Sequence, residues 1–456
     1  MLFGRENELQ YLNTVYETPG SQMIVVYGQK NVGKTSLLHE FTVSKETFYY
    51  TAISASTRQQ QFMLAQKSGQ KDSFSTEYPK YEDIFSVMQA NTTSDRKKIF
   101  VFDEWEHMIK SDISFMVALA QLLHHAYSNQ DVMIVLSSSS IGFIENDLVS
   151  KIGKEALHIS SFLKVKELKF SDLICAFPSY SIQECVKIYS LLGGFPGLWS
   201  YFDPHKSVEQ NICDTILKKG AFLQEEGIRI IKEELRETSV YNTILSALAD
   251  GHEKLNDLYT HTGFSRAKIS VYLKNLIELE IVEKVFSIDT PGKDSQKKGI
   301  YRISNPYVHF WFRYIYRNYG ECLSMAPQDF YNAYIKPDFS FYCNEYFSAI
   351  CREYMILSAA KGALSIAPQK FGLFDGKAGR IDYVGQDPGG RFVVAFCYYS
   401  KPMVTYEDYQ ANLSVLSQAK IKPEQIYIFA SERFDETLIL ESKIKGNIIL
   451  LRMDDL

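Results

Sequence analysis

The stretch Gly28–Ser36 reads GQKNVGKTS and follows the apolar run QMIVVY at 22–27, which predicts a buried strand. A run with helical character, LLHEFTV, comes directly after it. The pattern G-x-x-x-x-G-K-[ST] between a strand and a helix is typical of a phosphate-binding loop. We therefore predict an α/β fold in which a parallel sheet carries this loop at its edge.

The residue types of this loop suit the phosphates of ATP. Gly28 and Gly33 let the backbone curl so that amide N–H groups point inward, and the helix N-terminus adds partial positive charge. We expect Lys34 to reach the β- and γ-phosphates and the Thr35 hydroxyl to ligate Mg²⁺. The predicted nucleotide-binding residues of the loop are Gly28, Gln29, Lys30, Asn31, Val32, Gly33, Lys34, Thr35 and Ser36.

P-loop ATPases pair this loop with acidic residues at the end of a neighbouring strand, and this chain has an apolar strand that ends in two acids. Residues 97–104 read KKIFVFDE, so four apolar residues carry Asp103 and Glu104 to the carboxyl end of a strand. Ligands bind at this end of the strands in open α/β sheets. We expect Asp103 to hold Mg²⁺ through water and Glu104 to polarise the attacking water as general base. The predicted catalytic residues are Lys34, Asp103 and Glu104.

A third apolar strand at 132–136 ends in four serines, 137–140. A polar side chain at this position could contact the γ-phosphate or the water. For any single serine, a serine-rich turn without a functional role is a reading of nearly equal weight.

Five features in this order resemble the archaeal-type P-loop ATPases of the AAA+/STAND group. They are FGRENEL at 3–9, the P-loop, the acidic strand, the serine strand end, and GGFP at 193–196. The resemblance covers about residues 1–225, and the P-loop and the acidic pair are its most specific parts. It implies an ATP-binding domain that is followed by a helical lid.

The same resemblance assigns roles to residues outside the P-loop. It implies that the segment around Phe3–Glu6, with Phe3 and Arg5 as its site residues, packs on the adenine. It also implies that Ser138 or Ser139 acts as the polar sensor of the phosphate, and that a lid helix beginning at Pro196 contacts the nucleotide.

The chain departs from this family at one position. Relatives commonly carry a Gly-Arg pair after the sensor strand, where this chain has Gly153-Lys154. A lysine keeps the positive charge but loses the planar fork with which arginine grips a phosphate. Because arginine fingers contribute about 10³–10⁵ in rate, we expect slow turnover.

Residues 240–304 predict a winged helix. Helices are expected at 241–249, 254–263 and 266–282, and a polar excursion at 289–299 separates two apolar stretches. Three helices followed by a two-stranded wing form a variant of the DNA-binding helix-turn-helix.

The charge of this segment leaves two readings open. The predicted recognition helix and its approach, 261–275, contain basic residues and no acid, which suits contact with the phosphates of double-stranded DNA. The other reading is a packing module that senses the lid, as in STAND proteins, and the two carry about equal weight. The predicted DNA-binding residues are Arg266, Lys268, Lys274, Lys297 and Lys298.

An aromatic stretch at 301–320, YRISNPYVHFWFRYIYRNYG, is expected to pack in a core. Together with the segment after it, this stretch resembles the part of the same ATPase family that joins the winged helix to a PD-(D/E)xK nuclease-like domain. The resemblance runs from about 300 to 456. It implies a C-terminal α/β domain of the restriction-endonuclease-like class.

The residues that hold Mg²⁺ in such nucleases are incomplete here. Asp382 stands at the aspartate position, but Phe396 and Tyr398 replace the usual Glu and Lys. Ser348 stands where the helix glutamate is expected, with Glu345 one turn away as a substitute. Because a lone carboxylate holds a hard divalent cation poorly, we expect no DNA hydrolysis, which leaves a binding or assembly role for which a protein partner is one candidate. The other reading, with somewhat more weight, is that Asp382 is an ordinary surface residue of a strand.

The composition bounds these readings. The chain has 456 residues, is 46% hydrophobic, and carries 49 Lys+Arg against 54 Asp+Glu, which excludes a disordered chain. A net charge of −5 gives no global attraction to nucleic acid or anionic lipid. Seven scattered cysteines without a CxxC pair, no signal peptide and no apolar run near 18 residues indicate a reduced cytoplasmic protein with no membrane association.

Single cores stop growing at about 250–300 residues, so several domains are expected. We divide the chain into an ATPase core, a helical lid, a winged helix, an aromatic connector and a PD-(D/E)xK-like domain. Their predicted ranges are 1–160, 161–227, 228–305, 306–335 and 336–456.

The predicted function is that of an ATP-binding protein, a slow Mg²⁺-dependent ATPase that acts as a nucleotide-controlled switch and associates with DNA. The alternative is a DNA- or protein-binding regulator or scaffold that binds ATP without useful turnover. A third reading, an ATP-dependent nuclease, is disfavoured by Phe396 and Tyr398.

Overall fold

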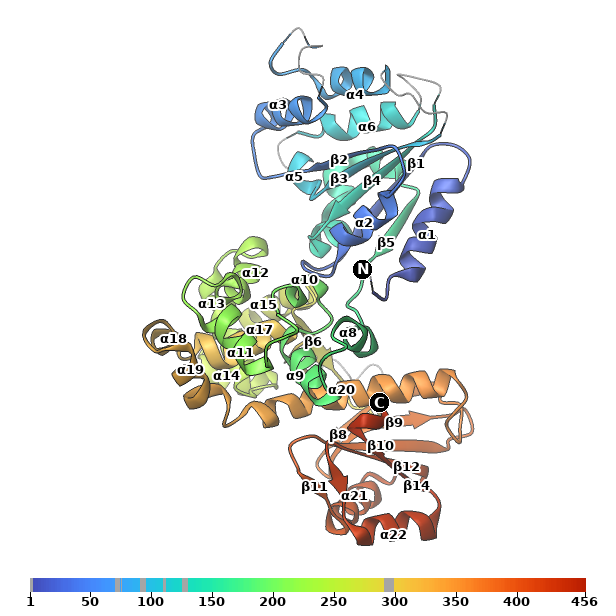
Figure 1. Cartoon of the computed structure of the whole chain (residues 1–456), viewed down its shortest axis with the longest axis vertical. Helices are drawn as coiled ribbons and strands as arrows, with labels where there is room; N and C mark the ends of the chain where they lie inside the picture. Colours follow the sequence, from blue (N-terminus) through green and yellow to red (C-terminus); the bar gives the residue numbers. More distant parts are fainter. Residues whose placement is uncertain are drawn as a thin grey trace. The chain divides into compact units, whose positions relative to one another are not determined.

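The computed structural model describes residues 3–69, 74, 76–90, 96–109, 112–124, 130–290 and 299–456. It divides into two compact units (Figure 1). Unit 1 comprises Met1–Asp172 and Phe195–Trp199, and unit 2 comprises Leu173–Gly194 and Ser200–Leu456. The predicted division into five parts is finer than these two units and stays a prediction.

Unit 1 is a parallel five-stranded sheet, in the order β2-β3-β4-β1-β5, with helices on both faces. The predicted P-loop type of α/β fold is confirmed. Its elements are α1 (Glu6–Glu17), β1 (Gln22–Tyr27), α2 (Lys34–Thr42), β2 (Thr47–Thr51), α3 (Thr57–Lys67), α4 (Tyr81–Ala90), β3 (Lys98–Asp103), α5 (Glu106–Ile109), α6 (Ser114–Leu123), β4 (Val132–Ser138), α7 (Leu148–Ile152), β5 (Ser161–Lys164) and α10 (Pro196–Trp199).

The central strands are almost wholly apolar because both faces of the sheet are covered. Helices α3, α4 and α6 cover one face, and α1 and α2 lie on the other (Figure 1). Alternate residues of each strand face opposite sides, so Phe100 and Phe102 join the core under α3, α4 and α6. Their neighbours Ile99 and Val101 are also fully buried, on the opposite face.

The register of the sheet gathers the polar strand ends. Asp103 lies opposite Thr51 of β2 on one side and opposite Ser137 of β4 on the other. Ser138 lies opposite Tyr27, the last residue of β1, and the P-loop starts at the next position. The acids, the serines and the P-loop therefore share one edge of the sheet.

Among the described residues, unit 2 contains the remaining helices and three further sheets, one of five strands and two of two strands. Its elements are α8 (Phe170–Ala176, which begins in unit 1), α9 (Ile182–Leu192), α11 (Val208–Ile212), α12 (Glu226–Glu234), α13 (Thr238–Ala249), α14 (Leu255–Thr262), α15 (Arg266–Glu278), β6 (Val282–Val285), β7 (Ile300–Ile303), α17 (Pro306–Phe310), α18 (Tyr319–Ser324), α19 (Pro327–Phe330), α20 (Phe339–Ala360), β8 (Lys370–Gly376), β9 (Gly379–Gln386), β10 (Phe392–Tyr398), β11 (Met403–Val404), α21 (Tyr406–Ala419), β12 (Pro423–Ala430), β13 (Arg433–Phe434), α22 (Glu436–Lys445) and β14 (Ile448–Arg452).

Helices α13, α14 and α15 and the antiparallel pair β6–β7 form the expected winged helix. The Ser265 side chain caps α15 by accepting a hydrogen bond from the Lys268 amide. The prediction that this helix runs to residue 282 was wrong. It ends at Glu278, because Glu280 takes a positive φ of 56° and β6 begins two residues later. Of the predicted wing, residues 291–298, with Lys297 and Lys298, lie outside the described residues.

The aromatic stretch packs in a core, as expected. Tyr307, Phe310, Trp311 and Phe312 are at most 1% exposed. The Trp311 indole N–H donates to the Gln224 carbonyl at 2.7 Å. The stretch therefore holds the segment before α12 and the winged helix together within unit 2.

A five-stranded mixed sheet, in the order β14-β12-β10-β9-β8, forms the C-terminal part of unit 2. The pairs β8–β9 and β9–β10 are antiparallel, whereas β10–β12 and β12–β14 are parallel. This is the expected C-terminal α/β sheet, and its restriction-endonuclease-like character stays a prediction. Among the described residues, no helix is long and apolar enough to cross a membrane.

Candidate active site

The P-loop turns sharply at its glycines. Gly28 and Gly33 have φ values of 155° and 97°, and Asn31 between them also has a positive φ of 66°. A Cβ atom at Gly28 would lie only 2.3 Å from the Val165 carbonyl oxygen, so a larger residue would displace the strand beside it. Glycine is thus required at position 28 for two reasons: the backbone has a positive φ, and the Val165 carbonyl lies too close for a side chain.

Lys34 opens α2 and its ammonium is folded over the loop. Its Nζ atom donates to the carbonyls of Gly28 and Gln29 at 2.9 and 3.0 Å, and to the Ser139 hydroxyl at 3.2 Å. Burial lowers the pKa of Lys34, while the nearby charges of Glu104 and Asp103 oppose that shift. The side chain is therefore a buried cation at the mouth of an anion-binding loop.

Asp103, at the end of β3, has two unequal carboxylate oxygens. Its Oδ2 accepts hydrogen bonds from the Thr35 and Tyr49 hydroxyls, both at 2.9 Å. Its Oδ1 is buried and has no hydrogen-bond partner. A buried carboxylate oxygen without a donor, beside a hydroxyl, fits a hard cation such as Mg²⁺, which prefers oxygen ligands.

Glu104 follows in a left-handed backbone conformation, with φ at 54°. Its carboxylate accepts a hydrogen bond from the Ser139 amide at 3.1 Å and another from the Ser139 hydroxyl. Burial acts to raise the pKa of Glu104, but the Lys34 charge and the Ser139 hydrogen bonds together lower it. The group is therefore ionised and able to accept a proton from water.

Of the two serines predicted as the phosphate sensor, Ser139 contacts Lys34 and Glu104. Ser138 is fully buried and its hydroxyl accepts a hydrogen bond from the Ser140 amide at 3.1 Å. The geometry favours Ser139 for that role. Lys154, the predicted substitute for an arginine finger, lies exposed on a 3₁₀ helix, Gly153–His158.

Arg5 is 3% exposed and holds the P-loop in place through its hydrogen bonds. Its guanidinium donates to the carbonyls of Val32 and Lys166 at 2.8 and 2.6 Å, and pairs with Glu8 at 2.8 Å. Phe3 is half-buried. That this segment packs on an adenine stays a prediction, whereas holding the P-loop in place is a role that the sequence did not reveal.

Helix α10 packs directly on the P-loop. The Gly197 amide donates to the Asn31 carbonyl at 2.9 Å. A Cβ at Gly197 would lie 2.9 Å from the Asn31 Cα, and the Pro196 ring lies 3.1 Å from where a Cβ on Gly33 would be. The predicted position of Pro196 beside the nucleotide site thus has a geometric basis, although its contact with nucleotide stays a prediction.

Glu106 is a site residue that sequence reasoning missed. It is 4% exposed, and its pKa is raised to about 8 by burial and by the charge of Glu104. At neutral pH it therefore carries a proton. The signal available in the sequence was a third acid two positions after the acidic pair, in Asp103-Glu104-Trp105-Glu106.

This burial predicts a pH-dependent stability. An ordinary glutamate has a pKa near 4.3, so between about pH 4.5 and 8 the unfolded chain releases a proton that folded Glu106 keeps. Stability therefore falls as the pH rises through this window. Relative to Glu106→Gln, the wild type should lose about 2–3 kcal/mol between pH 6 and 9. Urea denaturation at both pH values measures the difference, and parallel pH profiles for the two proteins would contradict it.

The candidate nuclease position in unit 2 is closed by protein groups. Asp382 accepts hydrogen bonds from the Ser348 hydroxyl and the Cys397 amide, both at 2.9 Å, and pairs with Arg380 at 3.2 Å. Glu345, the expected substitute acid, pairs with Arg302 at 3.6 Å. An arginine thus neutralises the carboxylate that would face a metal, and the absence of DNA hydrolysis stays a prediction.

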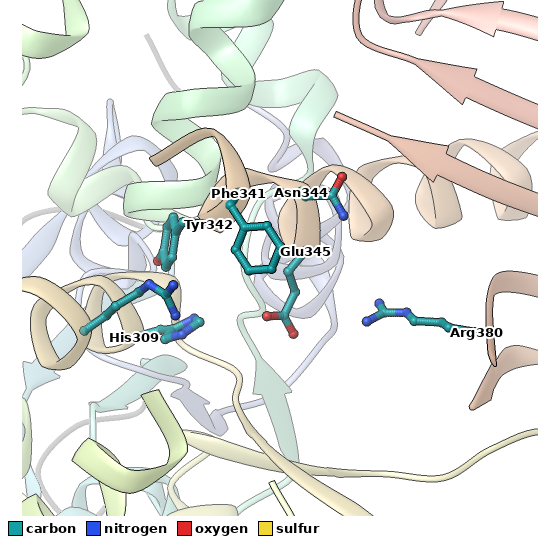
Figure 2. A pocket seen from close by; sticks show the side chains of 7 residues that line it. His309, Phe341, Tyr342, Asn344, Glu345 and Arg380 are labelled. Carbon is teal, nitrogen blue, oxygen red and sulfur yellow. The ribbon is translucent and has the colours of Figure 1, made fainter. Parts of the chain in front are cut away.

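A pocket of about 150 Å³ lies beside this position (Figure 2). Glu345 projects into it from helix α20, and the Arg380 guanidinium points toward Glu345 from one side, as Figure 2 shows. Arg313 is already bound to Asp338 and to the Ala249 carbonyl, and burial lowers the pKa of His309 to about 4, so it is neutral. The lining residues are His309, Arg313, Phe341, Tyr342, Asn344, Glu345 and Arg380. Because most of these groups are already engaged, we place the candidate active site at the P-loop.

The basic residues of α15 are exposed. Arg266 donates to the Asn256 side chain at 2.9 Å and stacks on Tyr259, and Lys268 lies over Phe264. Lys274 pairs with Glu278 at 3.5 Å. The predicted DNA-binding residues that the structure describes thus lie on one exposed helix.

Comparison with known proteins identifies three segments. Residues 2–202 match an ATPase domain predominantly from Archaea, residues 242–284 match bacterial regulatory proteins of the arsR family, and residues 311–411 match archaeal and bacterial proteins of unknown function. The chain therefore contains an archaeal-type ATPase domain and a helix-turn-helix, as the sequence resemblance implied.

An uncharacterized protein of Methanocaldococcus jannaschii, MJECL04, is 28% identical over 358 residues, which cover 78% of this chain and 77% of that protein. Among solved structures, a Walker-type ATPase of Pyrococcus abyssi is 16% identical, with a TM-score of 0.47 over 68% of this chain and 96% of that chain. The ORC2 protein of Aeropyrum pernix is 12% identical, with a TM-score of 0.46 over 70% of this chain and 94% of that chain.

Proposed function

We propose, because residues 2–202 match an ATPase domain predominantly from Archaea, that this chain is a slow Mg²⁺-dependent ATPase acting as a nucleotide-controlled switch. The observation that carries the proposal is the meeting of Lys34, Asp103, Glu104 and Ser139 at one edge of the sheet. Such a set supplies charge neutralisation, metal ligation and a general base in P-loop ATPases.

Each side chain has a task that follows from its chemistry. Lys34 and the loop amides of 28–35 would bind the phosphates, and Thr35 with Asp103 would hold Mg²⁺, which neutralises charge on the phosphates when bound. Glu104 would accept a proton from the attacking water. The Ser139 hydroxyl, which now contacts both Lys34 and Glu104, would report whether the phosphate position is filled.

The switch requires that ATP favour one arrangement of the chain over another. Helix α10 supports this part of the proposal, because Gly197 is hydrogen-bonded to the P-loop at Asn31. A change in the conformation of the P-loop on nucleotide binding would therefore alter the contact that α10 makes with it. Slow turnover is expected because relatives commonly carry arginine where this chain has Lys154, and a lysine cannot make the bidentate contact with a phosphate that arginine makes.

The test is nucleotide binding and phosphate release by the purified chain, with and without Mg²⁺. Lys34→Ala should lose ATP binding, since the loop then lacks its buried cation. Lys67→Ala, an exposed lysine of α3 in the same unit, is the matched control and should bind as the wild type does. Binding without any phosphate release by the wild type would favour the alternative, a regulator or scaffold that holds ATP without turning it over.

A second candidate function, association with double-stranded DNA, rests on the exposed basic face of α15 in the helix-turn-helix segment 242–284. The segment that follows β6 contacts the C-terminal sheet, because the Ile288 amide donates to the Leu373 carbonyl of β8 at 2.8 Å. Helix α15 is the predicted recognition helix, and its exposed basic residues suit contact with a major groove.

Charge reversal tests this second function. Arg266→Glu with Lys268→Glu should weaken DNA binding at least tenfold at low salt and flatten its salt dependence, because two phosphate contacts become repulsive. Lys422→Glu with Lys443→Glu, at two exposed lysines in the C-terminal part of unit 2, makes the same change in net charge and is the control. Binding that is equally weakened by the control, or not weakened by the double variant, would count against DNA recognition through α15.

A further inference from the structure

Two adjacent tyrosines on β2 point to opposite faces of the sheet. Tyr49 faces α2, where its hydroxyl donates to Asp103 Oδ2 at 2.9 Å. Tyr50 faces α3, where its hydroxyl donates to the Gln60 side chain at 3.0 Å. The alternation of side chains along a strand produces this separation. One hydroxyl therefore belongs to the candidate active site and the other to the core.

Tyr49 is held in place on both sides. Its ring stacks on His39 of α2, with centroids 4.6 Å apart and planes at 14°. Thr51, two residues along β2, is paired in register with Asp103 itself. The ring stack restrains the Tyr49 side chain, and the strand pairing fixes its backbone relative to that of Asp103.

The hydrogen bonds at Asp103 separate its two oxygens. Oδ2 receives both hydroxyl donors, from Thr35 and Tyr49, while Oδ1 is buried without a partner. A carboxylate held by two donors at one oxygen must keep the other oxygen directed away from them. Thr35 is itself an expected metal ligand. Tyr49 is not, so its hydrogen bond can only orient the Asp103 carboxylate.

We propose that Tyr49 is a positioning residue for the Mg²⁺ site, holding Asp103 so that its free oxygen faces the metal. This inference rests on the proposed ATPase function and adds a residue that the P-loop pattern does not contain.

The test is Tyr49→Phe, with Tyr50→Phe as the matched control. Each removes one tyrosine hydroxyl and its hydrogen bond from the same strand and keeps the ring. The readout is binding of a fluorescent ATP analogue as Mg²⁺ is titrated, with a parallel titration in EDTA. Tyr49→Phe should raise the Mg²⁺ concentration at half-saturation about tenfold, as expected for loss of a hydrogen bond to a charged group. Binding in EDTA should not change, and Tyr50→Phe should match the wild type in both titrations.

A double-mutant cycle with Asp103→Asn separates orientation from a general structural effect. If Tyr49 acts through Asp103, Tyr49→Phe should have little further effect on the Mg²⁺ titration in the Asp103→Asn background. The inference is overturned if Tyr49→Phe leaves the Mg²⁺ dependence unchanged, or if it and Tyr50→Phe weaken binding alike with a matching fall in Tm. A wild type that binds no ATP at all would instead overturn the proposed function, and the inference with it.

Discussion

Glu104→Gln is expected to reduce phosphate release about 10²–10⁴-fold while leaving ATP binding close to that of the wild type. The amide has nearly the shape of the carboxylate, so the hydrogen bond from the Ser139 amide can be kept. It cannot accept a proton from water. The loss should therefore appear in kcat and not in the affinity for nucleotide, because only the transition state depends on the base.

The measurement is single-turnover phosphate release beside an equilibrium binding titration. Glu155→Gln is the matched control, because Glu155 is a buried carboxylate of the same unit that pairs with His158 at 3.3 Å and touches neither Lys34 nor Ser139. Turnover in Glu104→Gln within a few-fold of the wild type would show that another group accepts the proton.

Trp311→Ala is expected to destabilise unit 2 by about 3–5 kcal/mol. The indole is 1% exposed and fills the space above Gly227, where a Cβ would lie 2.3 Å from the ring. Its N–H also satisfies the Gln224 carbonyl, which would be left without a donor. The cost therefore combines a large cavity with an unpaired buried acceptor.

Thermal and chemical unfolding followed by circular dichroism measures this loss. Tyr319→Ala lies eight positions along the chain at an exposed aromatic residue, 40% accessible, and should change stability by less than about 0.5 kcal/mol. A similar loss of stability in both variants would mean that the specific packing of Trp311 is not what stabilises unit 2.

The sequence predicted those parts of the fold and site that are local in the chain. The P-loop lies within nine residues, and its strand and helix flank it directly, so one pattern specifies them. Asp103 and Glu104 were found because an apolar run ends at them. Tyr49 could not be found in this way, because the pair Tyr49-Tyr50 does not reveal which ring faces α2. Only the register of β2 against β3 decides that.

Long-range contacts account for the other misses. Arg5 bonds to carbonyls 27 and 161 residues away, which no local pattern predicts. The end of α15 was placed too late because Leu279–Ile281 continue the apolar spacing of the helix. The left-handed Glu280 and the pairing of β6 with β7 end it instead.

The segment Phe195–Trp199 belongs to unit 1, although the chain on both sides of it belongs to unit 2. The chain therefore crosses between the units three times, and no single cut separates them. A fragment ending at Asp172 would lack Gly197, the residue that backs Asn31 in the P-loop. A truncated ATPase domain prepared for crystallisation should accordingly extend past Trp199, and a protease that cuts after Asp172 should leave the Phe195–Trp199 part of unit 1 on the other fragment.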